Sequence, residues 1–162
     1  MKTSVRTPMK SSLKHGTLYV LGALAATTLA MAPAAHAVTP ETATLSFDCG
    51  SYGSGTATLK ATQDGTAATV DVSTEAITAP VAIGANSVES TLTLSKNGTD
   101  TATFTGNSNP AIPAGGAVST GPLAGTVASG DSLEAQALTI VVFGITVECT
   151  ATSPQNPGPF VF

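Results

Sequence analysis

Apolar and polar residues alternate along much of the chain after residue 40, at the two-residue period of a half-buried β-strand. The alternation is clear over residues 57–72, on both sides of Asp64-Gly65, and over residues 88–104, on both sides of Asn97-Gly98. Asp-Gly and Asn-Gly between alternating runs are strong signals for tight hairpin turns. The pattern therefore predicts two β-hairpins.

The remaining segments predict further strands and one long loop. Residues 79–84 resemble a short strand with an edge proline, and residues 123–127 a second short strand. Residues 106–116 contain two prolines and a Gly-Gly pair, which predicts the longest loop. Together with the hairpins, these segments give seven to nine strands between residues 38 and 162.

The apolar register changes near Phe143-Gly144. Inward positions are even-numbered through Val142 and odd-numbered from Ile145. Either a bulge at Gly144 or a tight turn explains the change. A turn is the better explanation, because a bulge would require one strand of about fourteen residues, beyond the usual length.

Short strands with frequent turn signals are typical of a β-sandwich or a small barrel. Thr- and Ser-rich faces opposite apolar faces favour an antiparallel sandwich whose two sheets each have one wet side. The positions predicted to point inward are Leu45, Phe47, Leu59, Val70, Val72, Leu92, Leu94, Phe104, Leu138, Ile140, Val142, Ile145 and Val147. Those predicted to be exposed are Thr58, Lys60, Asp71, Thr93 and Thr103.

The two cysteines of the chain end two similar runs, residues 45–49 and 145–149. Cys49 and Cys149 each continue the apolar register of a strand, so both are predicted to be buried. A disulfide between them would join the first strand of the domain to the last and requires an oxidising compartment.

The N-terminal segment predicts such a compartment. Residues 1–16 carry four bases and no acid, residues 17–31 are almost wholly apolar or small, and Ala35-His36-Ala37 provides a small-x-small site. These features predict a secretory signal peptide over residues 1–37. A retained signal anchor is the alternative, which Pro33 disfavours because it would interrupt a continuing helix.

The expected organisation is a signal peptide (residues 1–37), a β-sandwich domain (residues 38–152) and a Pro-rich tail (residues 153–162). We expect the protein to be secreted, with no membrane span after cleavage, since no second apolar segment or sorting motif follows. The tail ends in Phe160-Val161-Phe162. These residues either dock on the core of the domain or form a peptide that binds a partner.

Removing residues 1–37 leaves ten acidic residues against Lys60 and Lys96, a net charge of −8 compared with −4 for the whole chain. Nucleic acid and anionic membrane surfaces are therefore not expected partners. All histidine, arginine and methionine residues also lie within residues 1–37. Histidine-based triads and ordinary zinc sites are thus excluded from the rest of the chain. We expect no enzyme activity, catalytic residues, metal ligands or cofactor.

Two groups of carboxylates have alternative interpretations. Asp48 and Glu148 precede the cysteines and could form a glycosidase-like pair, although solvated acids that discourage pairing between strand edges explain them better. Asp64, Asp100 and Asp131 stand at turns. They could bind Ca²⁺, but their spacing is unlike that of an EF-hand, and turn formation is the better explanation.

The basic Ala-rich leader, the acidic Thr-, Gly- and Ala-rich remainder and the two cysteine-ending runs resemble secreted immunoglobulin-like domains of actinobacterial type. This resemblance implies an immunoglobulin-like sandwich and carries no site residues. It departs from antibody domains in lacking a core Trp and in the long separation of its cysteines.

The expected function is that of a secreted, non-catalytic structural or protein-binding module. Its partner would be an extracellular protein or a component of the cell envelope. The alternative is a small-molecule carrier similar to the enediyne-binding apoproteins, and a carboxylate-based hydrolase comes third.

Overall fold

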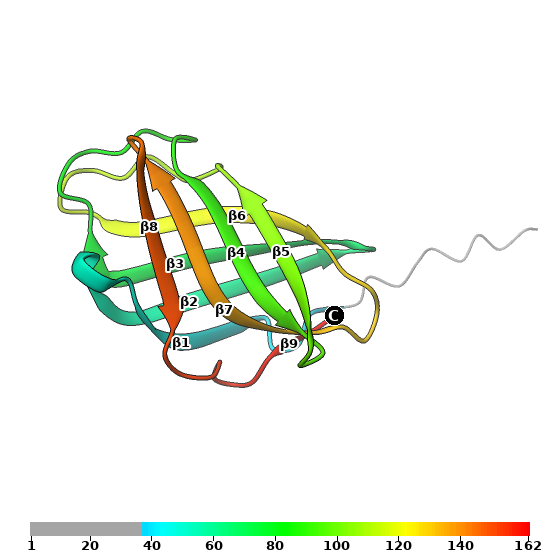
Figure 1. Cartoon of the computed structure of the whole chain (residues 1–162). Helices are drawn as coiled ribbons and strands as arrows, with labels where there is room; N and C mark the ends of the chain where they lie inside the picture. The colour runs from blue at the N-terminus through cyan, green and yellow to red at the C-terminus, as the bar shows by residue number, and fades with distance from the viewer. Residues whose placement is uncertain (1–36) are drawn as a thin grey trace, which may run out of the picture. The chain divides into compact units, whose positions relative to one another are not determined.

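The computed structural model describes residues 37–162 (Figure 1). The predicted signal peptide lies outside the described residues, apart from Ala37. Within this range no helix has the length and apolarity needed to cross a membrane. The elements are β1 (Thr42–Asp48), η1 (Gly50–Tyr52), β2 (Ser54–Asp64), β3 (Ala67–Thr78), β4 (Glu89–Lys96), β5 (Asp100–Gly106), β6 (Ala117–Thr126), β7 (Ser132–Val142), β8 (Ile145–Ala151) and β9 (Phe160–Val161).

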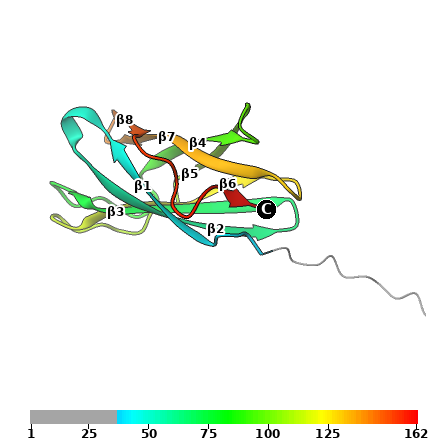
Figure 2. The ribbon, with the colours of Figure 1, turned by 90° about the horizontal axis from the view of Figure 1, so that it is seen from below.

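The all-β prediction is confirmed, but the sandwich is corrected to a closed barrel. Eight antiparallel strands follow one another in the order β1, β2, β3, β6, β5, β4, β7 and β8, and β8 returns to β1. Figure 2 shows that the barrel is flattened into two layers, one of β1, β2, β3 and β6 and the other of β4, β5, β7 and β8.

The two layers meet at two weak seams. β5 pairs with β6 only at Thr105 and Ala124. β1 pairs with β8 only at Phe47 with Ala151 and Asp48 with Thr150. The alternation of apolar and polar residues indicates that the strands form two layers. It does not indicate whether the edges of the layers meet, because the strands at the seams are not joined by tight turns.

The tight turns agree with the sequence. Gly65 has a φ of 61° in the β2–β3 turn. In the β4–β5 turn, Asn97 and Gly98 have φ of 53° and 80°, the positive values that a type I′ turn requires at both central positions. A tight turn, not a bulge, also joins β7 to β8, since Val142 pairs directly with Ile145.

Two segments have a different secondary structure from the one that the sequence predicts. Residues 79–84 are not a strand, because Ile83 makes only an isolated bridge with Ile112. These two residues form a small second core with Ala79 and Val88, packed against the ends of β7. The predicted short strand at residues 123–127 is instead part of the ten-residue β6.

The predicted inward positions are buried in β1 to β5, where their registers are continuous. In β7 and β8, Leu138, Ile140, Val142 and Val147 are only partly buried. Ile145 was predicted to be buried and is 49% exposed. Among the positions predicted to be exposed, Thr58, Lys60 and Thr103 are exposed, whereas Asp71 and Thr93 are half-buried.

The Cys49–Cys149 disulfide is confirmed, and both cysteines are buried. The disulfide joins the end of β1 to β8. It lies next to the seam where the ladder between these two strands contains only two residue pairs. The bond therefore links the two layers where few backbone hydrogen bonds hold them together.

The tail is part of the barrel. Phe160 and Phe162 are buried in the main core, and their ring centroids lie 6.4 Å apart in an edge-to-face arrangement. β9 pairs with the start of β7, and Val161 bridges to Thr39 on its other side. The buried side chain of Gln155 accepts a hydrogen bond from the backbone N–H of Ala135.

The proposed partner-binding role of Phe160, Val161 and Phe162 is corrected for this reason. Both aromatic rings lie inside the protein, and only Val161 is exposed. Docking on the core, the other alternative for the tail, is what the structure shows.

We expect the Cys49→Ala/Cys149→Ala double variant to be less stable than the wild type by about 4 to 5 kcal/mol in the chain-entropy model, because the bond closes a loop of about 100 residues. Denaturant unfolding measures the difference. Reductant should destabilise the wild type and leave the double variant unchanged. Equal stability of the oxidised wild type and the double variant would contradict this role for the bond.

We expect Phe160→Ala to lower the free energy of unfolding by about 3 to 5 kcal/mol, the usual cost of truncating a buried Phe. Val161→Ala is the matched control, because its side chain is 46% exposed on the same strand, and its effect should stay below about 1 kcal/mol. Thermal unfolding of both variants tests this. Similar effects of the two substitutions would show that the tail is not an integral part of the core.

Candidate functional site

Large apolar side chains are exposed at five positions among residues 37–162, and two of them share one turn. Phe143 is 64% exposed and Ile145 is 49% exposed. With Val141 and Val142 they form the β7–β8 tip, which we define as residues 141–145. The tip lies at the same end of the barrel as the loops formed by residues 79–88 and 107–116 (Figure 1).

The backbone of the tip places Phe143 in an unfavourable conformation. Its φ is 53°, in the left-handed region, and Gly144 follows with a φ of 75°. The left-handed conformation costs an L-residue about 1 to 2 kcal/mol, and type I′ turns favour Asn, Asp or Gly at this position. Because the ring of Phe143 is largely exposed, burial does not offset this cost. The stability of the barrel therefore does not explain a Phe here.

An open groove lies beside the tip on the outer face of β4, β5 and β7. Its volume is about 350 Å³. Hydroxyl groups of Thr91, Thr105 and Thr139, the carboxylate of Glu89 and the side chain of Val141 contribute to its walls. The groove therefore joins a polar surface to the apolar tip.

A second cavity lies between the two layers of the barrel. It has a volume of about 70 Å³ and almost entirely apolar walls. Its lining includes Phe47, both cysteines, Ile77 and Ala151. An engineered cavity that binds benzene has a volume of about 150 Å³, so this cavity as it stands accommodates only a few ligand atoms.

The two carboxylates that precede the cysteines are placed on the surface of the barrel, as the preferred interpretation of the sequence expects. Asp48 and Glu148 belong to neighbouring strands and are both exposed. Asp48 accepts a hydrogen bond of 2.6 Å from the backbone N–H of Gly50, which fixes the turn after β1. Neither carboxylate lines the groove or the cavity. Their positions suit solvated acids beside a strand edge.

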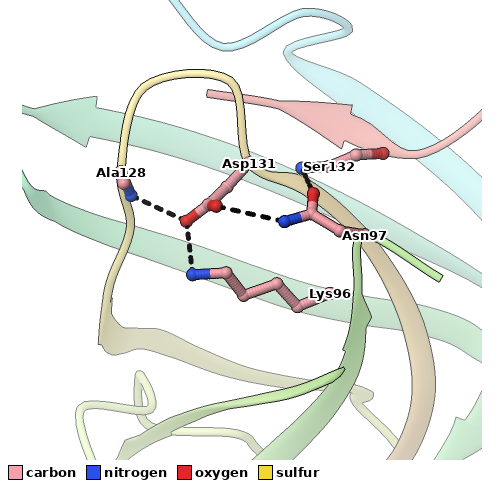
Figure 3. Close-up of polar contacts among 5 residues, drawn as sticks. All are labelled: Lys96, Asn97, Ala128, Asp131 and Ser132. Atoms are coloured by element: carbon pink, nitrogen blue, oxygen red, sulfur yellow. Dashed lines mark hydrogen bonds and ion pairs between the residues drawn. The ribbon is translucent and has the colours of Figure 1, made fainter. Parts of the chain in front are cut away.

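Asp131 is the centre of a polar cluster at the opposite end of the barrel (Figure 3). The Nζ atom of Lys96 lies 2.8 Å from its Oδ2 atom, and the backbone N–H of Ala128 donates a hydrogen bond of 2.7 Å to the same oxygen. Asn97 donates to Oδ1 through Nδ2 and accepts from the backbone N–H of Ser132 through its own Oδ1. The cluster thus ties the β4–β5 turn to the loop before β7.

The hydrogen bond from Lys96 holds the pKa of the buried Asp131 carboxyl below its usual value, and the Ala128 bond acts in the same direction against the effect of burial. Asp131 is therefore occupied by structural contacts. No group of three or more His, Cys, Asp or Glu side chains that could hold a metal ion occurs among residues 37–162.

Comparisons of the chain with protein-family models, curated proteins and solved structures found no match. The candidate site consequently depends on the geometry of this chain alone.

The shift in apolar register predicts the turn at Phe143-Gly144 but not the exposure of Phe143 and Ile145 beside it. The signal was present, because both favoured two-residue hairpin turns need positive φ at their first central position, and Phe is a poor residue there. The proposed site in the tail had the stronger apolar signal, yet its two rings are the ones that the fold buries.

We expect Asp131→Asn to lower the free energy of unfolding at pH 7 by about 2 kcal/mol, since hydrogen bonds to a charged group contribute roughly 1.5 to 3 kcal/mol. Because the folded pKa is lowered, this contribution is complete above the unfolded value of about 3.9 and is lost as the pH falls through the folded value. The difference between wild type and variant should thus be constant from pH 7 to about pH 5 and shrink in stronger acid.

Unfolding measured between pH 7 and pH 2 tests this prediction. Asp64→Asn is the control, since Asp64 is exposed at a turn, and it should have little effect at pH 7. If the free energies of unfolding of the wild type and the Asp131→Asn variant differ by the same amount at every pH, the ionised carboxylate is not the source of the stabilisation.

Proposed function

We propose that this protein is a secreted, non-catalytic protein-binding module that contacts its partner through the β7–β8 tip. The observation that carries the proposal is the exposed Phe143 in a left-handed conformation. A residue that is both strained and solvent-exposed contributes little to folding, and such strain is often associated with function. Aromatic residues, including Phe, are also enriched at protein–protein interfaces relative to the rest of the surface.

Secretion is part of the proposal. The predicted signal peptide and the Cys49–Cys149 bond both favour an oxidising compartment. We propose in addition that the two-layer barrel is a variant of the secreted immunoglobulin-like domains that the sequence resembles, with the edges of its layers joined at two seams.

A non-catalytic role is favoured by the chemistry of the described residues. Histidine and arginine are absent from residues 38–162. Asp131, whose carboxyl pKa is lowered, is engaged by Lys96 and backbone groups. These observations support a surface that binds rather than a site that reacts.

A small-molecule carrier is the second candidate, and the apolar cavity between the layers is the observation in its favour. With a volume of about 70 Å³, it would have to open to accept a drug-sized ligand, because such sites usually measure about 300 to 1,000 Å³. A panel of apolar dyes tests this candidate. A melting temperature that rises with dye concentration would support the carrier.

We expect Phe143→Asn to raise the stability of the protein by about 1 kcal/mol, because Asn suits the first position of a type I′ turn. The same substitution should weaken binding to the partner by at least about tenfold. A variant that is more stable and binds less tightly cannot be explained by misfolding. Thermal unfolding and a binding assay are needed together.

The partner is sought by placing a photoreactive benzoylphenylalanine at position 143 and irradiating the cells that make the protein. Position 161 is the control, because Val161 is exposed at the other end of the barrel. One macromolecule that crosslinks at position 143 and not at position 161 would support the module and supply the assay for Phe143→Asn. No specific crosslink at position 143, or unchanged binding of the Asn variant, would overturn the proposal.

A further inference from the structure

The first half of β8 has an open edge. β7 pairs with Ile145 to Thr150 of β8 on one side. On the other side, β1 reaches Thr150 and Ala151, Cys49 lies against Cys149 through the disulfide, and η1 contacts β8. No described residue on this side forms a ladder pair with Ile145 to Glu148. Figure 1 shows β8 as the outermost strand of its layer, with its upper part beyond the reach of β1. The free edge is defined as residues 145–148, because Cys149 is covered by Cys49, whose Cα atom lies 4.0 Å from its own.

The hydrogen-bond pattern indicates which groups this edge offers. Val142 and Ile145 close a two-residue turn and are therefore a hydrogen-bonded pair. The alternation of an antiparallel ladder then directs the backbone groups of Ile145, Val147 and Cys149 toward β7, and those of Thr146 and Glu148 away from it. Thr146 and Glu148 are both exposed. Their N–H and C=O groups are thus available to another strand.

The side chains show the same missing neighbour. Ile145 belongs to the inward register of β8, as its pairing with Val142 shows, yet it is 49% exposed. Val147, the next inward residue, is only partly buried. A strand placed on the free edge would cover both residues. Its own inward side chains would approach the seam, where Cys149, Ala151 and Ile77 line the apolar cavity.

The charges around the free edge have one sign. Glu148 lies on the edge itself, and Asp48 is on the outer face at the end of the adjoining β1. The two basic side chains of residues 38–162 are engaged elsewhere, since Lys60 pairs with Glu41 and Lys96 with Asp131. An approaching strand therefore meets negative charge that no neighbouring base neutralises.

We propose that the free edge of β8 accepts an extended segment of the partner protein, in which apolar residues alternate with polar residues that include Lys or Arg. Backbone hydrogen bonds to Thr146 and Glu148 would provide affinity, and apolar side chains beside Ile145 and Val147 would provide register. The inference deepens the proposed function, on which it rests, by specifying the chemistry of the partner. A second copy of this chain is a poorer occupant, because it brings the same net charge of −8 to the edge.

The probe is a synthetic nine-residue peptide in which Val alternates with Lys, and the control peptide carries Glu in place of Lys. Amide hydrogen exchange of the purified protein is measured by NMR with increasing amounts of each peptide. We expect the Lys peptide to slow exchange at Thr146 and Glu148 by at least about tenfold near saturation, and the Glu peptide to have no effect. Added salt should weaken the binding of the Lys peptide.

Two variants test the assignment to this edge. Glu148→Lys should weaken binding of the Lys peptide by about five- to tenfold, whereas Asp64→Lys, which changes the net charge equally at the distant β2–β3 turn, should change it much less. Thr146→Pro removes an outward N–H group without removing a bond to β7. It should abolish the protection, and its melting curve shows whether the barrel is intact.

The outcomes separate this inference from the proposed function. Protection at other amides, equal binding of both peptides or no binding would overturn the edge assignment, even if position 143 crosslinks to a specific partner. Protection of Thr146 and Glu148 that grows with protein concentration alone would identify a second copy as the occupant and overturn the assignment to a basic segment. If the Lys peptide binds but position 143 gives no crosslink, the proposed function is contradicted, and the edge remains an acceptor of an extended segment.

Discussion

The Cys49–Cys149 bond determines how the two layers of this protein stay together. Most strands are joined to their neighbours by long antiparallel ladders, but the ladder between β1 and β8 contains only two residue pairs. The bond lies next to this short contact and connects residues 100 positions apart. It allows β8 to leave β1 early without separating the layers. The open edge of β8 and the projecting β7–β8 tip both depend on this arrangement.

The features that the sequence predicted correctly are those with local signals. Gly65 in one turn and Asn97-Gly98 in the other adopt the positive φ that the turns require, which few other residues do easily. Leu59, Val70 and Leu94 are buried as their alternation predicts. The tight turn at Phe143-Gly144 also followed from a shift in register, a local signal.

The features that the sequence did not predict depend on contacts between distant segments. Closure into a barrel requires β8 to reach β1 and β5 to reach β6, and neither contact involves a tight turn. Ile145 has an inward register, but its burial needed a neighbouring strand that β1 does not supply. The burial of the tail was left open by the sequence for the same reason. Phe160 and Phe162 are buried only if the tail pairs with the start of β7. The sequence of the tail alone does not determine whether that pairing forms.

The position of β9 has a consequence for the order in which the protein can fold. Val161 lies between Thr39 and the start of β7, so one of the first described residues meets one of the last. Such pairings have a high contact order and form slowly. The main core lacks the rings of Phe160 and Phe162 until β9 has reached the start of β7. Completion of the core therefore depends on a contact between the two ends of the described residues, and not on the hairpins between them alone.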